Sequence, residues 1–264
     1  MTTNKDTLQS SRNFVLLAPL GSALPGGFGT VHDDFDRHSA LMSRMQQLRG
    51  RIYLDDGAIA KSDLDSQGRH RMPGDEASWH LLRMRADASV SGCARILAHP
   101  SDVSYSELRL ASSALAQCTT WGRGLRATME TEIAKAREVG KALIEPGGWA
   151  LAEDLRGSTE ALSIAIGALA WAQLLGGCAA FMTATVRHGS SSFLRRMGGV
   201  PVEVEGRPSP AYFDPDYGCE MELLRFDSQA LNPRFNAVFD KTRRLLVGAP
   251  VIVARAQASN RKAA

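Results

Sequence analysis

Residues 147–200 constrain the fold of this 264-residue chain more than any other stretch. The stretch opens with a short apolar run, 149–152, and a polar turn that contains Gly157 follows it. The next segment, 159–175, is rich in Ala, Leu and Ile and has no proline, which predicts a helix that two glycines end. A second apolar run, 178–186, is typical of a strand. The order therefore indicates a strand, a tight turn, a helix and another strand.

The turn between the first strand and its helix has the properties of an anion site. The first backbone N–H groups of a helix have no partner within the helix, and the helix dipole favours negative charge there. Arg156, Gly157, Ser158 and Thr159 occupy this turn. Two interpretations stay open: a cradle for a pyrophosphate group, or an ordinary strand-to-helix turn that carries one basic residue.

The composition sets the broad class of the protein. Hydrophobic residues make up 44% and charged residues 22% of the chain, as in a globular protein, and a net charge of +3 gives no argument for nucleic acid. The four cysteines are scattered without ligand spacing, so we expect neither a metal site nor a disulfide framework. No signal peptide and no apolar run of membrane-spanning length is evident. We therefore expect a cytoplasmic protein with no integral membrane segment.

The rest of the chain divides around this core. We predict an N-terminal extension over 1–30, a main domain over 31–230, and a C-terminal helix with a basic tail over 231–264. Within the main domain, 79–84 and 89–98 predict a β-hairpin. Further expectations are a helix over 33–49, a polar loop over 61–76, and a helix over 123–143 that Pro146 stops.

The turn sequence resembles a signature of the GNAT acyltransferase superfamily, Gln/Arg-x-x-Gly-x-Gly/Ala. Residues 156–161 match it at Arg156 and Ala161, and Thr159 stands where the central glycine is usual. The resemblance covers roughly residues 45 to 225. It implies an α/β (α+β) fold with a mixed, mostly antiparallel central sheet flanked by helices. It also implies transfer of an acyl group from a thioester to an amine.

The second hairpin strand narrows the resemblance to one branch. Residues 90–97 read Val-Ser-Gly-Cys-Ala-Arg-Ile-Leu, similar to the Val-x-Gly-x-x-Arg-Leu strand of acyl-homoserine-lactone synthases and long-chain N-acyl amino acid synthases. Arg95 matches the strand arginine of that branch, and Glu145 matches its glutamate. The branch often carries an arginine where this chain has Gly148. The resemblance implies acyl-CoA or an acyl-acyl carrier protein as the donor.

The same resemblance suggests roles for individual residues. Backbone N–H groups of Leu151 and Ala152 would polarise the thioester carbonyl, and the turn residues Arg156, Gly157, Ser158 and Thr159 would hold the donor. Glu145 is the first candidate for the general base and Glu153 the second. The alternative for Glu145 is a solvent-facing residue at the end of a helix. Candidates for the acceptor site are Arg51, Tyr53, Trp79, His80 and Arg95.

The function that we expect is N-acyl transfer from an acyl thioester to a small-molecule amine such as an amino acid derivative. An acetyl-CoA-dependent N-acetyltransferase and a catalytically silent module that binds an acyl ligand or a protein stay open as alternatives. Leu194 occupies the position where many relatives carry a tyrosine that acts as general acid, and Tyr212 or Tyr217 could replace it. A carrier protein and a second copy of the chain are possible partners.

Overall fold

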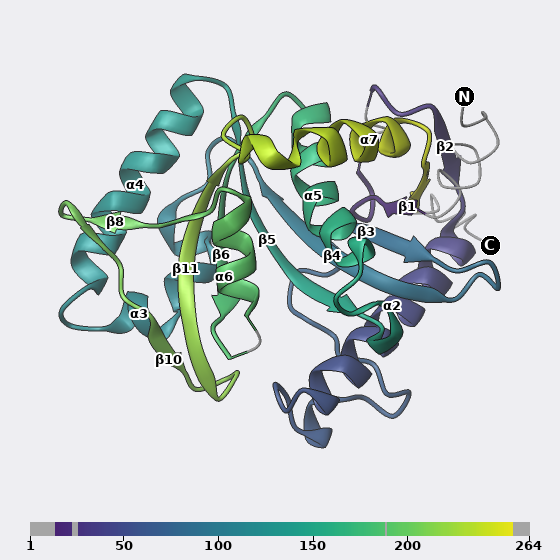
Figure 1. Ribbon diagram of the computed structural model, residues 1–264, viewed down its shortest axis with the longest axis horizontal. Helices are drawn as coiled ribbons and strands as arrows, with labels where there is room; N and C mark the ends of the chain where they lie inside the picture. Colours follow the sequence, from purple (N-terminus) through teal and green to yellow (C-terminus); the bar gives the residue numbers. More distant parts are fainter. Residues whose placement is uncertain (1–13, 23–25, 188, 256–264) are drawn as a thin grey trace, which may run out of the picture.

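The computed structural model describes residues 14–22, 26–187 and 189–255. In these ranges ten strands form one mixed sheet, in which β10, β11, β6, β5, β4, β3, β1, β12 and β2 lie in that order and β7 pairs with β11 (Figure 1). The strands of this sheet are β1 (Phe14–Leu17), β2 (Thr30–Asp33), β3 (Trp79–Met84), β4 (Val90–His99), β5 (Ala142–Leu151), β6 (Cys178–Thr185), β7 (Val200–Pro201), β10 (Tyr212–Asp214), β11 (Cys219–Asp227) and β12 (Pro250–Val253). A separate ribbon pairs β8 (Glu203–Val204) with β9 (Arg207–Pro208).

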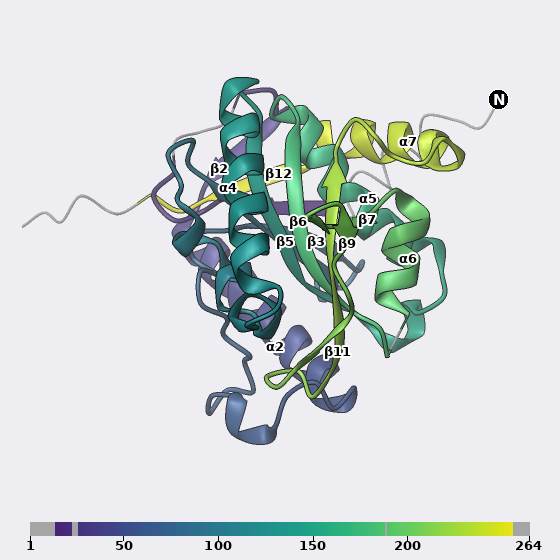
Figure 2. The same ribbon diagram turned by 90° about the vertical axis from the view of Figure 1, so that its left-hand side faces the viewer.

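Helices cover both faces of the sheet (Figure 2). The α-helices are α2 (Phe35–Asp55), α3 (Ala114–Gln117), α4 (Gly122–Glu138), α5 (Thr159–Leu174), α6 (Ser190–Met197) and α7 (Asn236–Val247). Short 3-10 turns are η1 (Lys61–Asp63), η2 (Tyr105–Glu107), η3 (Arg109–Ser112), η4 (Glu153–Leu155) and η5 (Pro233–Phe235). In the core, α5, α6 and α7 pack on one face, and α2 and α4 pack on the other.

The predicted fold class is confirmed, because most neighbouring strands are antiparallel and helices flank the sheet. The parallel pairs are β5 with β6, β1 with β12 and β12 with β2. The predicted hairpin is also confirmed, since β3 and β4 pair antiparallel along their length. The two segments that we predicted on either side of the main domain each contribute a strand to the sheet. β1 comes from the N-terminal segment 1–30, and β12 comes from the C-terminal segment 231–264. Most of the predicted basic tail, 256–264, lies outside the described residues.

One predicted element is wrong. The helix expected over 123–143 ends at Glu138, and Ala142 begins the strand β5, which contains Pro146 instead of following it. Gly140 has a φ of +65°, a left-handed conformation that ends the helix before the proline is reached. Proline is tolerated within β5 because one edge of this strand has no hydrogen-bonded neighbour at that point.

The long loop between α2 and β3 packs closely on α2. A Cβ atom on Gly50 would lie 2.7 Å from the carbonyl oxygen of Gly68 and 2.9 Å from a methyl carbon of Leu64. His70 N–H donates to the carbonyl of Gln46, 3.1 Å away. The absence of a side chain at Gly50 is therefore what lets the loop reach the helix.

We predict that Gly50→Ala lowers the free energy of unfolding by about 1–3 kcal/mol, because the added methyl group meets loop backbone that cannot move aside. A loss of stability would indicate the close packing, because inside an ordinary helix Ala is favoured over Gly by about 1 kcal/mol and the same substitution would stabilise the protein. Denaturant unfolding measures the change. Arg51→Ala, at the exposed next position of α2, serves as the control and should stay within about 0.5 kcal/mol of wild type. A stabilised Gly50→Ala protein would contradict the close packing.

Candidate active site between two parting strands

The central strands β5 and β6 run side by side for only a short distance. Their parallel pairing joins Ala142–Ile144 to Cys178–Ala180 and then stops. Beyond Ile144, β5 continues to pair with β4, while β6 continues with β11. The sheet therefore opens from Glu145 onward. The opening thus begins before Leu151 and Ala152, the positions at which we expected backbone N–H groups to polarise the thioester carbonyl.

The local sequence explains why the strands separate there. Pro146 has no N–H to give to a neighbouring strand, and Gly148 adopts a φ of +58°. The pairing of β4 with β5 also shifts its register between Cys93 and Arg95, opposite these residues. A proline, a left-handed glycine and a bulge at one point bend β5 away from the line that β6 follows.

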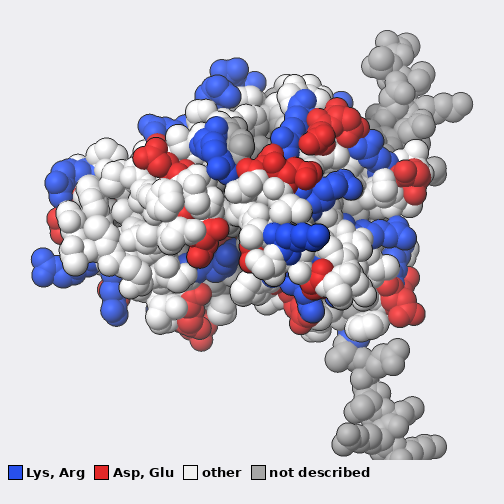
Figure 3. Space-filling model, turned by 90° about the horizontal axis from the view of Figure 1, so that it is seen from below, with Lys and Arg blue, Asp and Glu red and all other residues white. Residues whose placement is uncertain are grey.

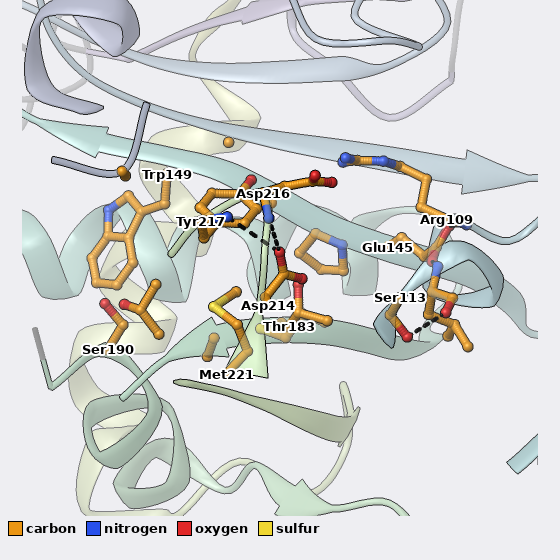
Figure 4. Close-up of a pocket in the computed structure, with 18 of the residues that line it drawn as sticks. Arg109, Ser113, Glu145, Trp149, Thr183, Ser190, Asp214, Asp216, Tyr217 and Met221 are labelled. Atoms are coloured by element: carbon orange, nitrogen blue, oxygen red, sulfur yellow. Dashed lines mark hydrogen bonds between the residues drawn. The ribbon is translucent and has the colours of Figure 1, made fainter. Parts of the chain in front are cut away.

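A cavity of about 550 Å³ lies in the opening between β5 and β6, and we call it the splay cavity (Figure 4). Both parted strands contribute to its wall, together with α3, α5, α6, η3, β4, the end of α2, the loop after α2 and the β10–β11 hairpin. Such a volume is typical of sites for small molecules and cofactors. Apolar side chains such as Phe181, Met182 and Leu194 lie beside polar ones such as Ser113 and Thr183.

Glu145 lies in the wall of the splay cavity and is 6% exposed. Its Oε2 accepts from the backbone N–H of Arg109 at 2.8 Å and lies 2.8 Å from His99 Nε2, while its Oε1 accepts from Leu110 N–H at 2.9 Å. The carboxylate thus fixes η3 against β5. An ionised carboxylate has about four acceptor sites, so one site on Oε1 stays available to a ligand or to water.

Two tyrosines and an arginine also line the cavity: Tyr53, Tyr217 and Arg109. The rings of Tyr53 and Tyr217 are 6.4 Å apart in an edge-to-face arrangement. Burial raises the pKa of both hydroxyls, so both stay protonated at neutral pH and can donate a hydrogen bond. Arg109 extends toward Asp216 and Tyr217 (Figure 4). Asp214 accepts from the N–H groups of Asp216 and Tyr217 at 3.0 and 3.2 Å, which holds the hairpin turn in place.

A buried cluster of charges supports the cavity from behind. Asp75 receives two hydrogen bonds from the Arg49 guanidinium, at 3.1 and 2.5 Å, and a third from Gln46 at 3.0 Å. Arg95, which is 1% exposed, donates to Pro73 O at 2.9 Å and lies 3.8 Å from Asp75. A Cβ atom on Gly148 would lie 3.1 Å from Arg95 and 3.3 Å from Arg49. The glycine therefore makes room for the two arginines.

The turn predicted as a cradle lies at the start of α5, with Ser158 capping the helix by accepting from Glu160 N–H at 3.1 Å. Its arginine, Arg156, donates to Asp56 at 2.9 Å, and its side chain is 44% exposed. Ala152 N–H is also engaged, since it donates to Ser91 O at 2.8 Å. Glu153 is exposed in η4.

The candidate residues fall into three groups. Glu145 and Tyr53 line the splay cavity. Arg95 and His80 are buried in the charge cluster at Asp75, where His80 bonds Asp75 O at 2.8 Å, whereas Trp79 is buried in the core beside α5, stacked on Phe28 and tilted against Trp171. The remaining candidates are not among the residues that line it; they are Arg51, Leu151, Ala152, Glu153, Arg156, Gly157, Ser158 and Thr159. Sequence reasoning missed Arg109 and Asp214, which are brought to the cavity only by tertiary packing.

Neither a metal site nor a membrane-spanning helix is found among the residues that the structure describes. Among them, no group of three or more His, Cys, Asp or Glu side chains is arranged to hold a metal ion. In the same ranges, no helix combines the length and the apolar character needed to cross a bilayer.

Comparisons with known proteins find no matching family model and no matching curated protein, but they find solved structures. BjaI, a CoA-dependent acyl-homoserine lactone synthase with SAM and isopentyl-CoA, is 14% identical, with a TM-score of 0.52 over 92% of this chain and 93% of its own. TofI, in a ternary complex with an inhibitor and MTA, is 14% identical, with a TM-score of 0.50 over 88% and 99%. FeeM, an N-acyl amino acid synthase from uncultured soil microbes, is 15% identical, with a TM-score of 0.47 over 74% and 86%. At these identities the likeness to BjaI and TofI establishes the fold, which is the one the sequence resemblance predicted.

The buried histidine behind the cavity predicts a pH dependence of stability. Burial lowers the pKa of His80 to about 4, against about 6.5 in an unfolded chain, so the unfolded state binds the proton first as pH falls. Stability should therefore decrease between about pH 6.5 and pH 4, by up to about 3 kcal/mol from this group. The lowered pKa values of His38 and His70 act in the same direction.

Urea unfolding at several pH values measures this slope, and His80→Gln should flatten it while keeping an N–H donor for Asp75 O. The matched comparison is His32→Gln, an exposed residue on β2, which should leave the slope unchanged. Equal slopes in wild type and His80→Gln would show that this imidazole does not link folding to pH.

Proposed function

We propose that the protein is an N-acyltransferase that moves an acyl group from an acyl thioester, carried by coenzyme A or an acyl carrier protein, to a small amine. The observation that carries the proposal is the splay cavity, which opens between two parting strands of an acyl-synthase fold. The similar protein BjaI has been solved with SAM and isopentyl-CoA. We propose the cytoplasm as the location, and a carrier protein or a second copy of the chain as partners.

The reaction needs little covalent machinery from the protein. The amine nitrogen attacks the thioester carbonyl, the C–S bond breaks, the amine loses a proton and the sulfur leaves as a thiolate or a thiol. Holding both substrates in one cavity makes the attack effectively intramolecular. Beyond Ile144, β6 no longer pairs with β5, so this edge of β5 is left without a neighbouring strand. Backbone N–H groups on the unpaired edge could polarise the carbonyl. Because Ala152 N–H already bonds Ser91 O and Leu151 does not line the cavity, we assign this role to the part of β5 that does, residues 147–149.

Glu145 is our candidate for the base that takes the proton of the amine, directly or through one water. It lines the cavity, and its Oε1 has one acceptor site left. Glu153 stays a weaker candidate, because it is exposed in η4 and is not part of the cavity wall. A protonated tyrosine, Tyr217 or Tyr212, could donate to the departing sulfur, since both line the cavity and burial raises the pKa of both hydroxyls.

The acceptor amine would bind at the end of the cavity that holds Tyr53 and Arg109. Of the other predicted acceptor residues, Arg95, Trp79 and His80 are buried and would act by positioning this wall. Arg51 is exposed on α2. One observation favours the alternative of a silent binding module: three hydrogen-bond donors already occupy the Glu145 carboxylate.

A direct assay tests the proposal. The protein is mixed with acyl-CoA donors from two to twelve carbons, or with acyl carrier protein loaded with the same chains, and with a panel of amines and amino acids. Release of free thiol is followed, and the acylated amine is identified by mass spectrometry. Thiol release that depends on an amine supports the enzyme. Tight binding of donors without any product would favour the silent module instead.

We predict that Glu145→Gln lowers turnover by about 100-fold, because a neutral amide cannot accept the proton of the amine. The affinity for the donor should change less than about threefold, since the donor does not bind through this carboxylate. Glu107→Gln is the matched control: this carboxylate also accepts a backbone N–H, that of Ser104, but lies outside the cavity. Circular dichroism checks that both variants fold. Full turnover in a folded Glu145→Gln protein would remove this residue from the mechanism.

A further inference from the structure

The buried charge cluster beside the splay cavity holds two positive charges and one negative charge. Its members are Arg49, Arg95 and Asp75, and the two arginines are 0% and 1% exposed. A guanidinium group keeps its proton in proteins. Burial acts to raise the pKa of Asp75, but the hydrogen bonds and the charge of Arg49 lower it, so this carboxylate is ionised. Among the described residues, Asp75 is the one acid that either arginine pairs with, so one positive charge is in excess.

The neighbouring titratable groups do not supply the missing negative charge. Burial raises the pKa of the Cys93 thiol to about 11 and also raises the pKa of the Tyr53 hydroxyl, so neither group is an anion at neutral pH. Burial lowers the pKa of His80 to about 4 and lowers that of His70 as well, so both imidazoles are uncharged there. The excess positive charge of the cluster therefore remains.

The two guanidinium groups also keep unused hydrogen-bond donors. Arg49 Nε and both Nε and Nη2 of Arg95 are buried and have no hydrogen-bond partner among the described residues. A buried charge without a full set of partners is costly, because the protein interior solvates it less well than water does. An apolar side chain in place of Arg95 would leave Arg49 and Asp75 as a matched pair. Stability alone therefore does not explain why a second arginine is buried here.

The cluster lies directly behind the glycines of β5 that line the splay cavity. Gly147, Gly148 and Met72 all belong to the cavity wall. A Cβ atom on Gly147 would lie 3.9 Å from Arg95 Nη2. A Cβ atom on Gly148 would lie 3.3 Å from Arg49 Nη1 and 3.8 Å from Met72 Sδ. Both positive charges thus lie immediately behind the stretch of β5 that we assign to the thioester carbonyl.

Exposed charges act on the cavity much less than these buried ones. Lys and Arg side chains lie among Asp and Glu side chains on the face seen from below in Figure 3. Water and salt screen such charges, and neighbours of opposite sign oppose their fields. With an effective dielectric constant of about 20, which suits sites in proteins, two unit charges interact about four times as strongly as in bulk water. The buried cluster is therefore the stronger source of positive potential at this wall.

We propose that the excess positive charge of Arg49 and Arg95 stabilises the negative charge that develops on the thioester oxygen when the amine attacks. The proposal rests on the proposed function, because it concerns the same cavity and the same reaction. As the C–N bond forms, the carbonyl π electrons move to the oxygen. They return when the C–S bond breaks and the sulfur leaves with its electron pair, while the amine proton goes to the base.

The arrangement favours the transition state over the bound donor. Neither arginine lines the cavity, so both act across its wall and add little to donor binding. A full negative charge on the oxygen exists only during the reaction, so a fixed positive potential stabilises the transition state more than the ground state. Asp75 holds the Arg49 guanidinium through two hydrogen bonds, which keeps this potential in a fixed place.

Arg95→Met tests the proposal, because it removes the unmatched charge and keeps much of the side-chain length. The variant should fold, since an apolar side chain often replaces a buried charge without loss of stability. In the thiol-release assay it should lower kcat by about 10- to 100-fold and change KM for the donor less than about threefold. Arg95→Lys keeps the charge and should retain turnover within about fivefold of wild type. Arg225→Met, on β11, is the control, because Glu132 already pairs with this arginine at 2.7 Å.

A measurement without turnover separates the electrostatic role from a structural one. The probe is a ketone analogue of acyl-CoA in which a methylene group between the carbonyl and the sulfur prevents acyl transfer. Its carbonyl carries an isotope label, and infrared difference spectroscopy of the complex reads the stretching frequency, which falls as the positive potential at the oxygen rises. The band should lie at a lower frequency in wild type, Arg95→Lys and Arg225→Met than in Arg95→Met.

Equal carbonyl frequencies in wild type and Arg95→Met would overturn the proposal even if turnover fell, because the loss would then come from a change of shape. Equal losses of turnover in Arg95→Lys and Arg95→Met would overturn it too. A shifted band in a protein that transfers no acyl group would support the electrostatic role and count against the proposed reaction. An analogue that binds none of the four proteins would contradict the proposed function, and the electrostatic role would fall with it.

Discussion

The three-residue contact between β5 and β6 is the constraint on which the rest of the molecule depends. If the two strands paired along their whole length, the sheet would have no opening, and the helices on its two faces would have nothing between them but a packed core. Pro146 and Gly148 prevent that pairing by removing a donor and by imposing a left-handed conformation. Two residues without special chemistry of their own thus create the space in which chemistry can occur.

An opening in a sheet must be held open, and polar contacts do this from three sides. Glu145 fastens η3 to the inner end of the gap through two backbone N–H groups. Asp75 fastens the loop after α2 through Arg49 and Arg95, which are both buried. Asp56 bridges the outer end. Buried charge is retained here although an apolar core would be less costly, which fits a role in shape more than in stability.

The sequence predicted the parts of this architecture that depend on local pattern. The β3–β4 hairpin and the helix after Gly157 follow from apolar alternation and glycine placement, and both are found where expected, whereas the strand before the turn begins at Ala142 and not at Trp149. The helix expected to reach residue 143 was wrong because Pro146 was taken for its stop, whereas Gly140 had already ended it. Contacts such as Arg156 with Asp56 join residues one hundred positions apart, and no local pattern carries that information.

The two ends of the described chain meet inside the sheet. β1 lies between β3 and β12, in parallel with a strand that begins only at Pro250. During synthesis on the ribosome, β1 has no such neighbour until residues 250–253 have been made, and such distant pairing slows folding. A truncation or an inserted tag close to β1 or β12 would therefore disturb the interior of the protein.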